Sequence, residues 1–260
     1  MAAKSIASFT IGIGLLNVPV GIYSAVRDDR VALRQMCAAH KSRIEQRTIC
    51  KAGGEVVEKI VKGYEVVGGE YVILTEDDLA SAALDISKRF MIEACVPAEA
   101  LDPRYFDKPY FVLPQAKDAG PAYVLLRDAL RASARIGIGR VTIRSKQHIS
   151  ALGVIGDALV LQLLHWPDEL VDMGEYAFPA GEANAAELAM ARQLVGALPS
   201  EFQPEGYKNQ YRLNLEALIE AKIEGRDSPF EESPEPEQPA AASLFALLQA
   251  SVDQIQRAAA

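Results

Sequence analysis

Cysteines and long apolar runs are both scarce in this 260-residue chain, and each scarcity narrows the class of protein. The three cysteines, Cys37, Cys50 and Cys95, are too few and too irregularly spaced for a disulfide framework, which indicates a reducing compartment. No run of about eighteen apolar residues occurs, so the sequence predicts no membrane-spanning helix. The apolar stretch 11–22 alternates like a strand and does not resemble a signal peptide. We therefore expect a soluble cytoplasmic protein without a membrane partner.

Motifs for catalysis are missing as well. The segment GIGLLN at 12–17 begins like a dinucleotide-binding fingerprint, but it lacks the third glycine and lies inside a strand pattern. The chain has no phosphate-loop lysine motif, no G-x-S-x-G and no H-E-x-x-H. Its histidines, His40, His148 and His165, are far apart in the sequence. The pattern favours binding over catalysis, and we expect no enzymatic activity and no cofactor.

One candidate metal site contains Cys37, His40 and Cys50. The spacing Cys37-x2-His40, followed by Cys50, supplies three zinc ligands, whereas a closed structural site takes four. The position that would complete a second pair is Gly53, which has no side chain. We therefore expect packed or idle thiols and no bound metal.

The net charge of −8 conceals a division along the chain. Residues 1–62 carry ten Lys or Arg against five Asp or Glu, and residues 86–150 carry eleven against six. Residues 63–85 and 167–260 are acidic instead, with net charges of −6 and −11. This asymmetry indicates basic surfaces for an anionic partner, although an ordinary solvated surface with an acidic tail would also explain it.

Period-two alternation and short β-branched runs dominate residues 5–114, which predicts strands. Within them, the segment 60–79 predicts a hairpin followed by a helix. Gly68 and Gly69 suit the hairpin turn because tight turns need positive φ, and Thr75 suits the N-cap of the helix.

Helices are predicted at 121–134, 184–197 and 209–224, where apolar residues share one face, and strands return between 135 and 166. Arg140, Arg144 and Lys146 are separated by even numbers of residues in this strand region. Even spacing places side chains on one face of a strand, so we expect a basic stripe there.

The C-terminal part is predicted to be a tethered helix. Residues 228–240, SPFEESPEPEQPA, are acidic and rich in proline, which is typical of an extended linker. An amphipathic helix capped by Ser243 follows, and such a helix is commonly a docking element. We therefore divide the chain into a core at 1–227, a linker at 228–240 and a docking helix at 241–260.

Seven segments of the chain, in this order, resemble the Ku family of DNA double-strand-break end-binding proteins in its short prokaryotic form, known from bacteria and phages. They are IGIGLLNVPVGIYSA (11–25), RIEQRTIC (43–50), VKGYEVVGGEYVILTEDDL (61–79), LDPRYFDKPYFVLP (101–114), AYVLLRDAL (122–130), IGRVTIRSKQHISAL (138–152) and LVLQLLHWPDEL (159–170). The resemblance covers nearly the whole chain. Two features depart from it: Gly21 stands where the family commonly has a lysine, and the lysine-rich tail of many relatives is missing.

The resemblance implies a mainly β fold with helices, consisting of a Ku-type β-barrel core, a bridge and a C-terminal helical arm. It implies that two copies form a homodimeric ring threaded by duplex DNA. The implied function is sequence-independent binding of double-stranded DNA ends in non-homologous end joining. The implied partners are DNA ends, a second copy and an ATP-dependent DNA ligase of the ligase D type, and the implied location is the nucleoid.

A ring that accepts any broken end must contact phosphates and not bases, so basic side chains are the DNA-binding candidates. They are Lys4, Arg43, Arg47, Lys62, Lys108, Arg140, Arg144 and Lys146. The candidates for the dimer interface are apolar and would serve equally well as core: Tyr123, Leu126, Leu161, Leu163 and Trp166. The candidates for ligase docking are Leu244, Leu247, Leu248 and Ile255 on the terminal helix.

Two other functions stay open at this point. A metal-dependent DNA-processing enzyme would hold Mg²⁺ with carboxylates, for which Asp102 and Asp107 are the candidates, although LDPRYFD also fits a turn. A protein–protein scaffold would use its amphipathic helices alone and would not bind DNA.

Overall fold

The computed structural model describes residues 4–82, 89–144, 146–227, 229–230 and 247–252. Its contacts divide the chain into two compact units, Met1–Asp28 with Gln35–Glu175 and Asp29–Arg34 with Tyr176–Ala260. The predicted boundaries of core, linker and docking helix stay predictions, because most of 228–260 lies outside the described residues.

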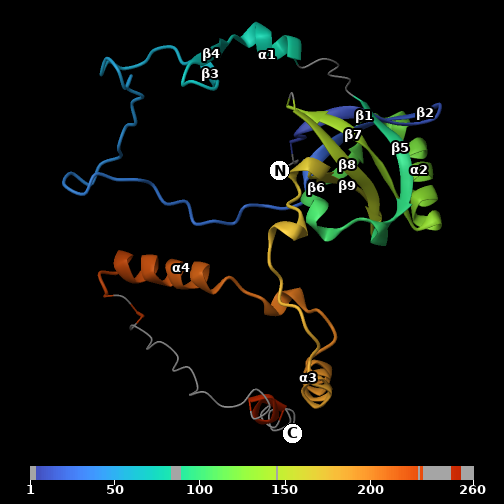
Figure 1. Cartoon of the computed structure of the whole chain (residues 1–260). Coiled ribbons are helices and arrows are strands. Elements are labelled where there is room, and N and C mark those ends of the chain that lie inside the picture. The colour runs from blue at the N-terminus through green and yellow to red at the C-terminus, as the bar shows by residue number, and fades with distance from the viewer. Residues whose placement is uncertain (1–3, 83–88, 145, 228, 231–246, 253–260) are drawn as a thin grey trace. The chain divides into compact units, whose positions relative to one another are not determined.

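The first unit contains a closed β-barrel with the strand order β1-β2-β6-β9-β8-β7-β5 (Figure 1). Neighbouring strands are antiparallel except for β1 and β5, whose parallel pairing closes the barrel and leaves no free sheet edge. The predicted β-barrel is confirmed. Its strands are β1 Ala7–Ile13, β2 Leu16–Ser24, β5 Arg89–Pro97, β6 Phe106–Pro114, β7 Arg135–Ile143, β8 Lys146–Ile155 and β9 Ala158–Leu164.

Apolar side chains from the strands and from helix α2, Gly120–Ser133, form the barrel core. Tyr123 of this helix is buried, and its hydroxyl joins two strands. The hydroxyl donates to the carbonyl of Val112 in β6 at 2.8 Å and accepts from the N–H of Leu159 in β9 at 2.9 Å. Helix α2 matches the helix predicted at 121–134, and Ala134 ends it with a left-handed φ of 50°.

This core contains four of the five residues expected at the dimer interface. Tyr123, Leu126, Leu161 and Leu163 are only 0–7% exposed. Their own chain covers them, so a second subunit could reach them only by opening the barrel. We therefore assign these four residues to the core of their own subunit. Of the five candidates, Trp166, which is half-buried, remains a candidate for the dimer interface.

The predicted hairpin and helix of the 60–79 segment are present as β3 Lys62–Glu65, β4 Tyr71–Leu74 and α1 Glu76–Ala82. Gly68 and Gly69 have φ values of 112° and 82°, as the turn requires. Thr75 caps α1 as expected, because its Oγ1 accepts from the N–H of Asp78 at 3.1 Å. In return, the hydrogen bonds that Thr75 donates to the carboxylate of Asp78 lower the pKa of this group.

The second unit contains helices α3 Ala185–Ala197 and α4 Gln210–Ile223, close to the predicted ranges. Asn184 and Asn209 cap them, each accepting a backbone N–H of the first turn. Within the described part, α3 buries no residue and α4 buries only Ala221. Short 3-10 turns lie at Ala98–Ala100, Pro103–Tyr105, Lys117–Ala119, Pro167–Glu169, Met173–Glu175 and Pro204–Gly206.

Residues 247–252 near the C-terminus are helical. Of the four ligase-docking candidates, Leu247 is 39% exposed and Leu248 is half-buried, whereas Leu244 and Ile255 lie outside the described residues. Among the helices of the described residues, none is long and apolar enough to span a bilayer.

Candidate nucleic-acid interface

All eight cations predicted to bind DNA have exposed side chains. Lys4 precedes β1, and Arg43 and Arg47 lie in the long segment between β2 and β3, which we call the arm (residues 25–61). Lys62 begins β3 and Lys108 lies in β6. The remaining three are on β7, on β8 and in the turn between them: Arg140, Arg144 and Lys146.

The prediction that these last three form a stripe on one strand face is wrong. Strand β7 ends at Ile143, and Arg144 lies in the hairpin turn with a left-handed φ of 49°. Lys146 begins β8 directly opposite Ile143, an inward-facing residue, whereas Arg140 faces outward. Since paired residues of antiparallel strands share a face, Arg140 and Lys146 belong to opposite faces of the hairpin.

Two of the eight cations already have acidic partners. Nη2 of Arg140 lies 2.9 Å from Oε1 of Glu93 on β5, and Arg47 lies 3.4 Å from Glu45. The other six form no ion pair within the part of the chain that the structure describes: Lys4, Arg43, Lys62, Lys108, Arg144 and Lys146. Charges without a partner gain most from a phosphate, so these six are better placed than Arg140 and Arg47.

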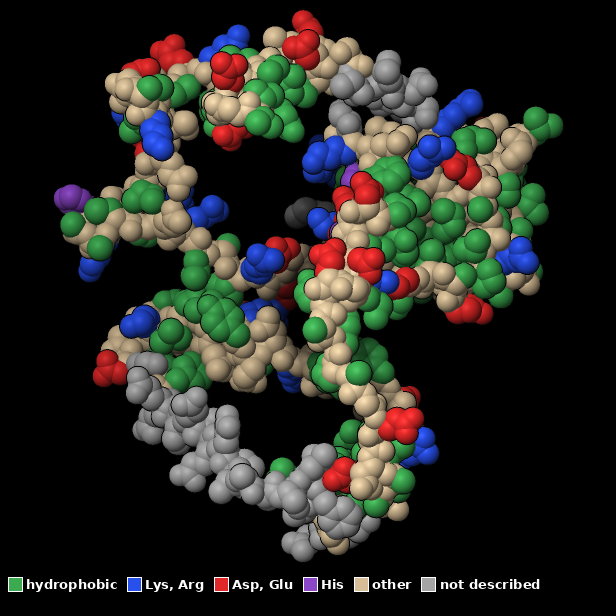
Figure 2. All heavy atoms as spheres, viewed as in Figure 1, with side chains coloured by type: hydrophobic (Ala, Val, Ile, Leu, Met, Phe, Trp, Pro, Cys, Tyr) green, Lys and Arg blue, Asp and Glu red, His purple; other side chains and the backbone are tan. Residues whose placement is uncertain are grey.

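Sequence reasoning overlooked further cations of the same region. Five exposed Lys and Arg residues between 25 and 61 likewise have no ion pair among the described residues: Arg27, Arg34, Lys41, Lys51 and Lys59. The sequence signal for these cations is the excess of Lys and Arg over Asp and Glu in residues 1–62. The basic side chains of the arm are spread along it and separated by apolar ones (Figure 2).

Two further basic residues of the barrel region, His148 and Arg104, add little positive charge. Burial lowers the pKa of His148 on β8, so its imidazole is neutral near pH 7. Arg104 is held by Asp102 at 2.7 Å, and this ion pair lowers the pKa of Asp102 to about 2. Asp102 also accepts the backbone N–H of Arg104 at 2.9 Å, so it caps a turn, as LDPRYFD suggested.

Asp102 and Asp107, the two carboxylates considered as Mg²⁺ ligands, have other surroundings in the structure. Over the described ranges, no three His, Cys, Asp or Glu side chains lie close enough to hold one ion. Asp102 is occupied by Arg104, and Asp107 follows in β6.

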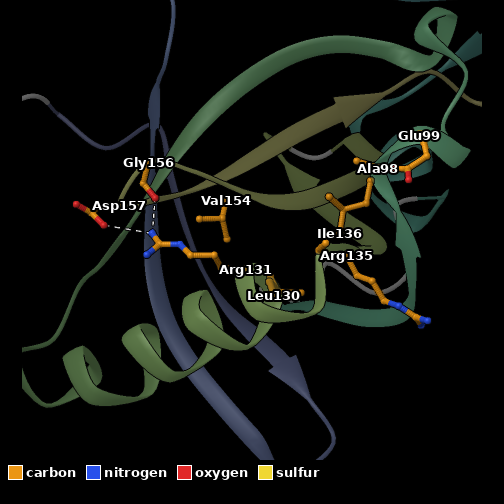
Figure 3. A pocket seen from close by; sticks show the side chains of 10 residues that line it. Ala98, Glu99, Leu130, Arg131, Arg135, Ile136, Val154, Gly156 and Asp157 are labelled. Atoms are coloured by element: carbon orange, nitrogen blue, oxygen red, sulfur yellow. Dashed lines mark hydrogen bonds and ion pairs between the residues drawn. The ribbon is translucent and has the colours of Figure 1, made fainter.

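An open pocket of about 730 Å³ lies beside the C-terminal end of α2 (Figure 3). Leu130, Ile136 and Val154 line it together with charged side chains. Arg131 points across it to the carbonyl of Gly156 and lies 3.2 Å from the carboxylate of Asp157. These bonds tie the helix to the β8–β9 turn. The ionisable side chains of the lining are Glu99, Arg131, Arg135 and Asp157.

Gly21 stands at the position where the resemblance leads us to expect a lysine, and another side chain occupies the space beside it. Gly21 is buried in β2, and a Cβ there would lie 2.8 Å from Nε2 of Gln115. A neutral amide therefore fills this space, and a longer side chain at 21 would have to displace it.

Comparison with known proteins identifies the family. Residues 12–190 match the family model described as Ku70/Ku80 beta-barrel domain. The chain is 36% identical to the "Non-homologous end joining protein Ku" of Opitutus terrae, covering 96% of this chain and 92% of that protein. The proteins of the same name from Bacillus subtilis and Mycobacterium tuberculosis are 33% and 35% identical, over 95% and 96% of this chain and 81% and 94% of theirs. The chain therefore belongs to the Ku family of non-homologous end joining proteins.

Proposed function

We propose that this chain binds double-stranded DNA ends without sequence preference, as a homodimeric ring threaded by the duplex. The observation that carries the proposal is the set of exposed cations, on the barrel and along the arm, that have no acidic partner among the described residues. Such cations recognise phosphates, which are the same at every DNA end. Membership of the Ku family supports the same function.

The ring requires a second copy, and uncovered apolar surface supports this requirement. In the second unit, Phe202, Tyr207, Tyr211 and Ile223 are 73–80% exposed. Figure 2 shows apolar side chains gathered over α4. Apolar surface of this extent on one chain marks an interaction site, and a second copy would bury it symmetrically. Trp166 remains a proposed member of the interface.

Recruitment of a ligase is the third part of the proposal. We assign it to the terminal helix, in which Leu247 and Leu248 would insert into an apolar groove of an ATP-dependent DNA ligase. The same function would place the protein on the nucleoid. Removal of residues 241–260 should therefore abolish ligase stimulation and leave end binding intact.

The test compares a linear duplex with a closed circle of the same sequence. We expect mobility shifts with the linear DNA at low salt and only weak, salt-sensitive binding to the circle. Equal affinity for the two would contradict threading, and no shift with either would favour the scaffold alternative.

A further inference from the structure

A short part of the arm packs on helix α4 of the second unit. Contacts assign residues Asp29–Arg34 to this unit, whereas Asp28 before them and Gln35 after them belong to the first. The chain thus enters the second unit at residue 29 and leaves it again after residue 34. We call residues 29–34, together with the first turns of α4 that they contact, the latch.

An ion pair fastens the latch. Nη1 of Arg212, in the first turn of α4, pairs with the carboxylate of Asp29. The Arg212 side chain is only 33% exposed, and its buried Nε has no hydrogen-bond acceptor among the described residues. A second acid, Glu216, has its Oε1 at 3.6 Å from this Nε. Since a partly buried guanidinium loses hydration, the directly paired carboxylate of Asp29 compensates for that loss.

Apolar packing adds little to the latch. Val31 and Leu215 are half-buried, whereas Leu33 and Tyr211 remain 66% and 73% exposed. A hollow of about 190 Å³ lies between the two segments, lined by these four residues and by Asp29, Arg30, Asn209 and Arg212. Because unfilled space forfeits packing contacts, the ion pair is the main fastener and the latch can open and close.

The latch lies among the cations of the arm. Arg27 precedes Asp29 by two residues and Arg34 follows Leu33 directly. Both cations are exposed and have no ion pair within the described ranges. Two residues of chain reach at most about 7 Å, so a fixed Asp29 confines the backbone of Arg27 to about two nucleotide steps of a DNA strand. Cations that are ordered in advance lose less conformational entropy when they bind.

We propose that Asp29 and Arg212 are positioning residues, whose ion pair fastens the arm to α4 and holds the neighbouring cations ready for DNA phosphates. This inference rests on the proposed DNA-binding function and adds to it a control of the arm by the second unit. An open latch leaves the same cations on a less ordered segment, which binds phosphates more weakly.

Trypsin digestion of the full-length protein without DNA tests the latch itself. Cleavage after Arg34 requires the segment to leave α4, while cleavage after Lys41, outside the latch, is the internal reference. Arg212→Gln should raise the ratio of the two initial rates by about two- to fivefold, as expected for loss of one partly exposed ion pair. The matched change Arg192→Gln on α3 should leave the ratio unaltered. Equal ratios in the two variants would overturn the latch.

Charge reversal provides the rescue. Asp29→Arg combined with Arg212→Asp rebuilds an ion pair of opposite sense at the same net charge. The combination should return the trypsin ratio to that of the unaltered protein, whereas Arg212→Asp alone should raise it. A ratio that stays high in the combination would show that the pair itself does not hold the arm.

DNA affinity tests the positioning role by the sign of the change. Asp29→Asn and Glu58→Gln each remove one exposed negative charge from the arm, so general electrostatics predicts the same small gain in affinity for a linear duplex. The latch predicts instead that Asp29→Asn binds about two- to fivefold more weakly than Glu58→Gln. Equal affinities would overturn the positioning role. Failure of the unaltered protein to bind DNA would refute the proposed function and this role with it, whereas the trypsin ratio would still decide the latch.

Discussion

The hydroxyl of Tyr123 provides the sharpest test of the barrel core. It links β6 to β9 by accepting the N–H of Leu159 and donating to the carbonyl of Val112. Tyr123→Phe removes both bonds and keeps the ring. Loss of the bond from the Leu159 N–H costs more than loss of the bond to the Val112 carbonyl. The N–H has a single proton to donate, whereas a carbonyl oxygen has two lone pairs and so a second chance to accept. One buried polar group without a partner costs about 1–3 kcal/mol, which is the destabilisation that we expect.

Urea unfolding followed by circular dichroism measures this loss. The urea concentration at the unfolding midpoint should fall, while the slope of the unfolding free energy against urea concentration stays constant. The mass of the native protein, measured by light scattering, should not change. Tyr23→Phe is the control, since the Tyr23 hydroxyl on β2 forms no hydrogen bond within the described ranges. A loss below about 0.5 kcal/mol, or an equal loss in the control, would refute the reasoning. Dissociation of the proposed dimer at unchanged barrel stability would instead restore Tyr123 to the subunit interface.

Three other predictions follow from the same structure. Gly139→Ala should destabilise the barrel by about 1–3 kcal/mol in urea unfolding, because the added Cβ would overlap the main chain of β5, whereas Gly196→Ala in open space on α3 should not. The pKa of Asp102 is lowered from 3.8 to about 2, so its contribution to stability is complete above pH 3.8 and is lost as the pH falls towards 2; Asp102→Asn should remove this part of the acid dependence. Lys62→Ala should reduce the salt slope of log affinity for DNA by about 1.8, since each contact adds about 0.9 and a ring holds two copies; an unchanged slope would exclude Lys62 from the phosphate contacts.

The sequence predicted the elements of this fold well where local signals were sufficient. The glycine pair and Thr75 located the hairpin and the start of α1, and apolar spacing located α2, α3 and α4. These features depend on φ preferences, capping and helical periodicity, which act over a few residues.

The site was less predictable because its geometry depends on which strands are neighbours. Even spacing predicts that Arg140 and Lys146 share a face, but the hairpin turn between them places the two residues on opposite faces. Only the pairing of β5 with β7 shows that Glu93 neutralises Arg140. Likewise, an apolar run such as 159–166 is compatible with a core or with an interface. Only the closed barrel shows that Leu161 and Leu163 are buried in the core of their own chain.

Topological trapping tests the central claim, a closed ring around the duplex, most directly. The protein is loaded onto linear DNA, the ends are joined by a ligase, and the complex is challenged with high salt. We predict that the protein remains on the closed circle and leaves it once the DNA is cut, because a threaded ring can escape only over an end. Equally fast release from the circle and from the linear DNA would contradict the account.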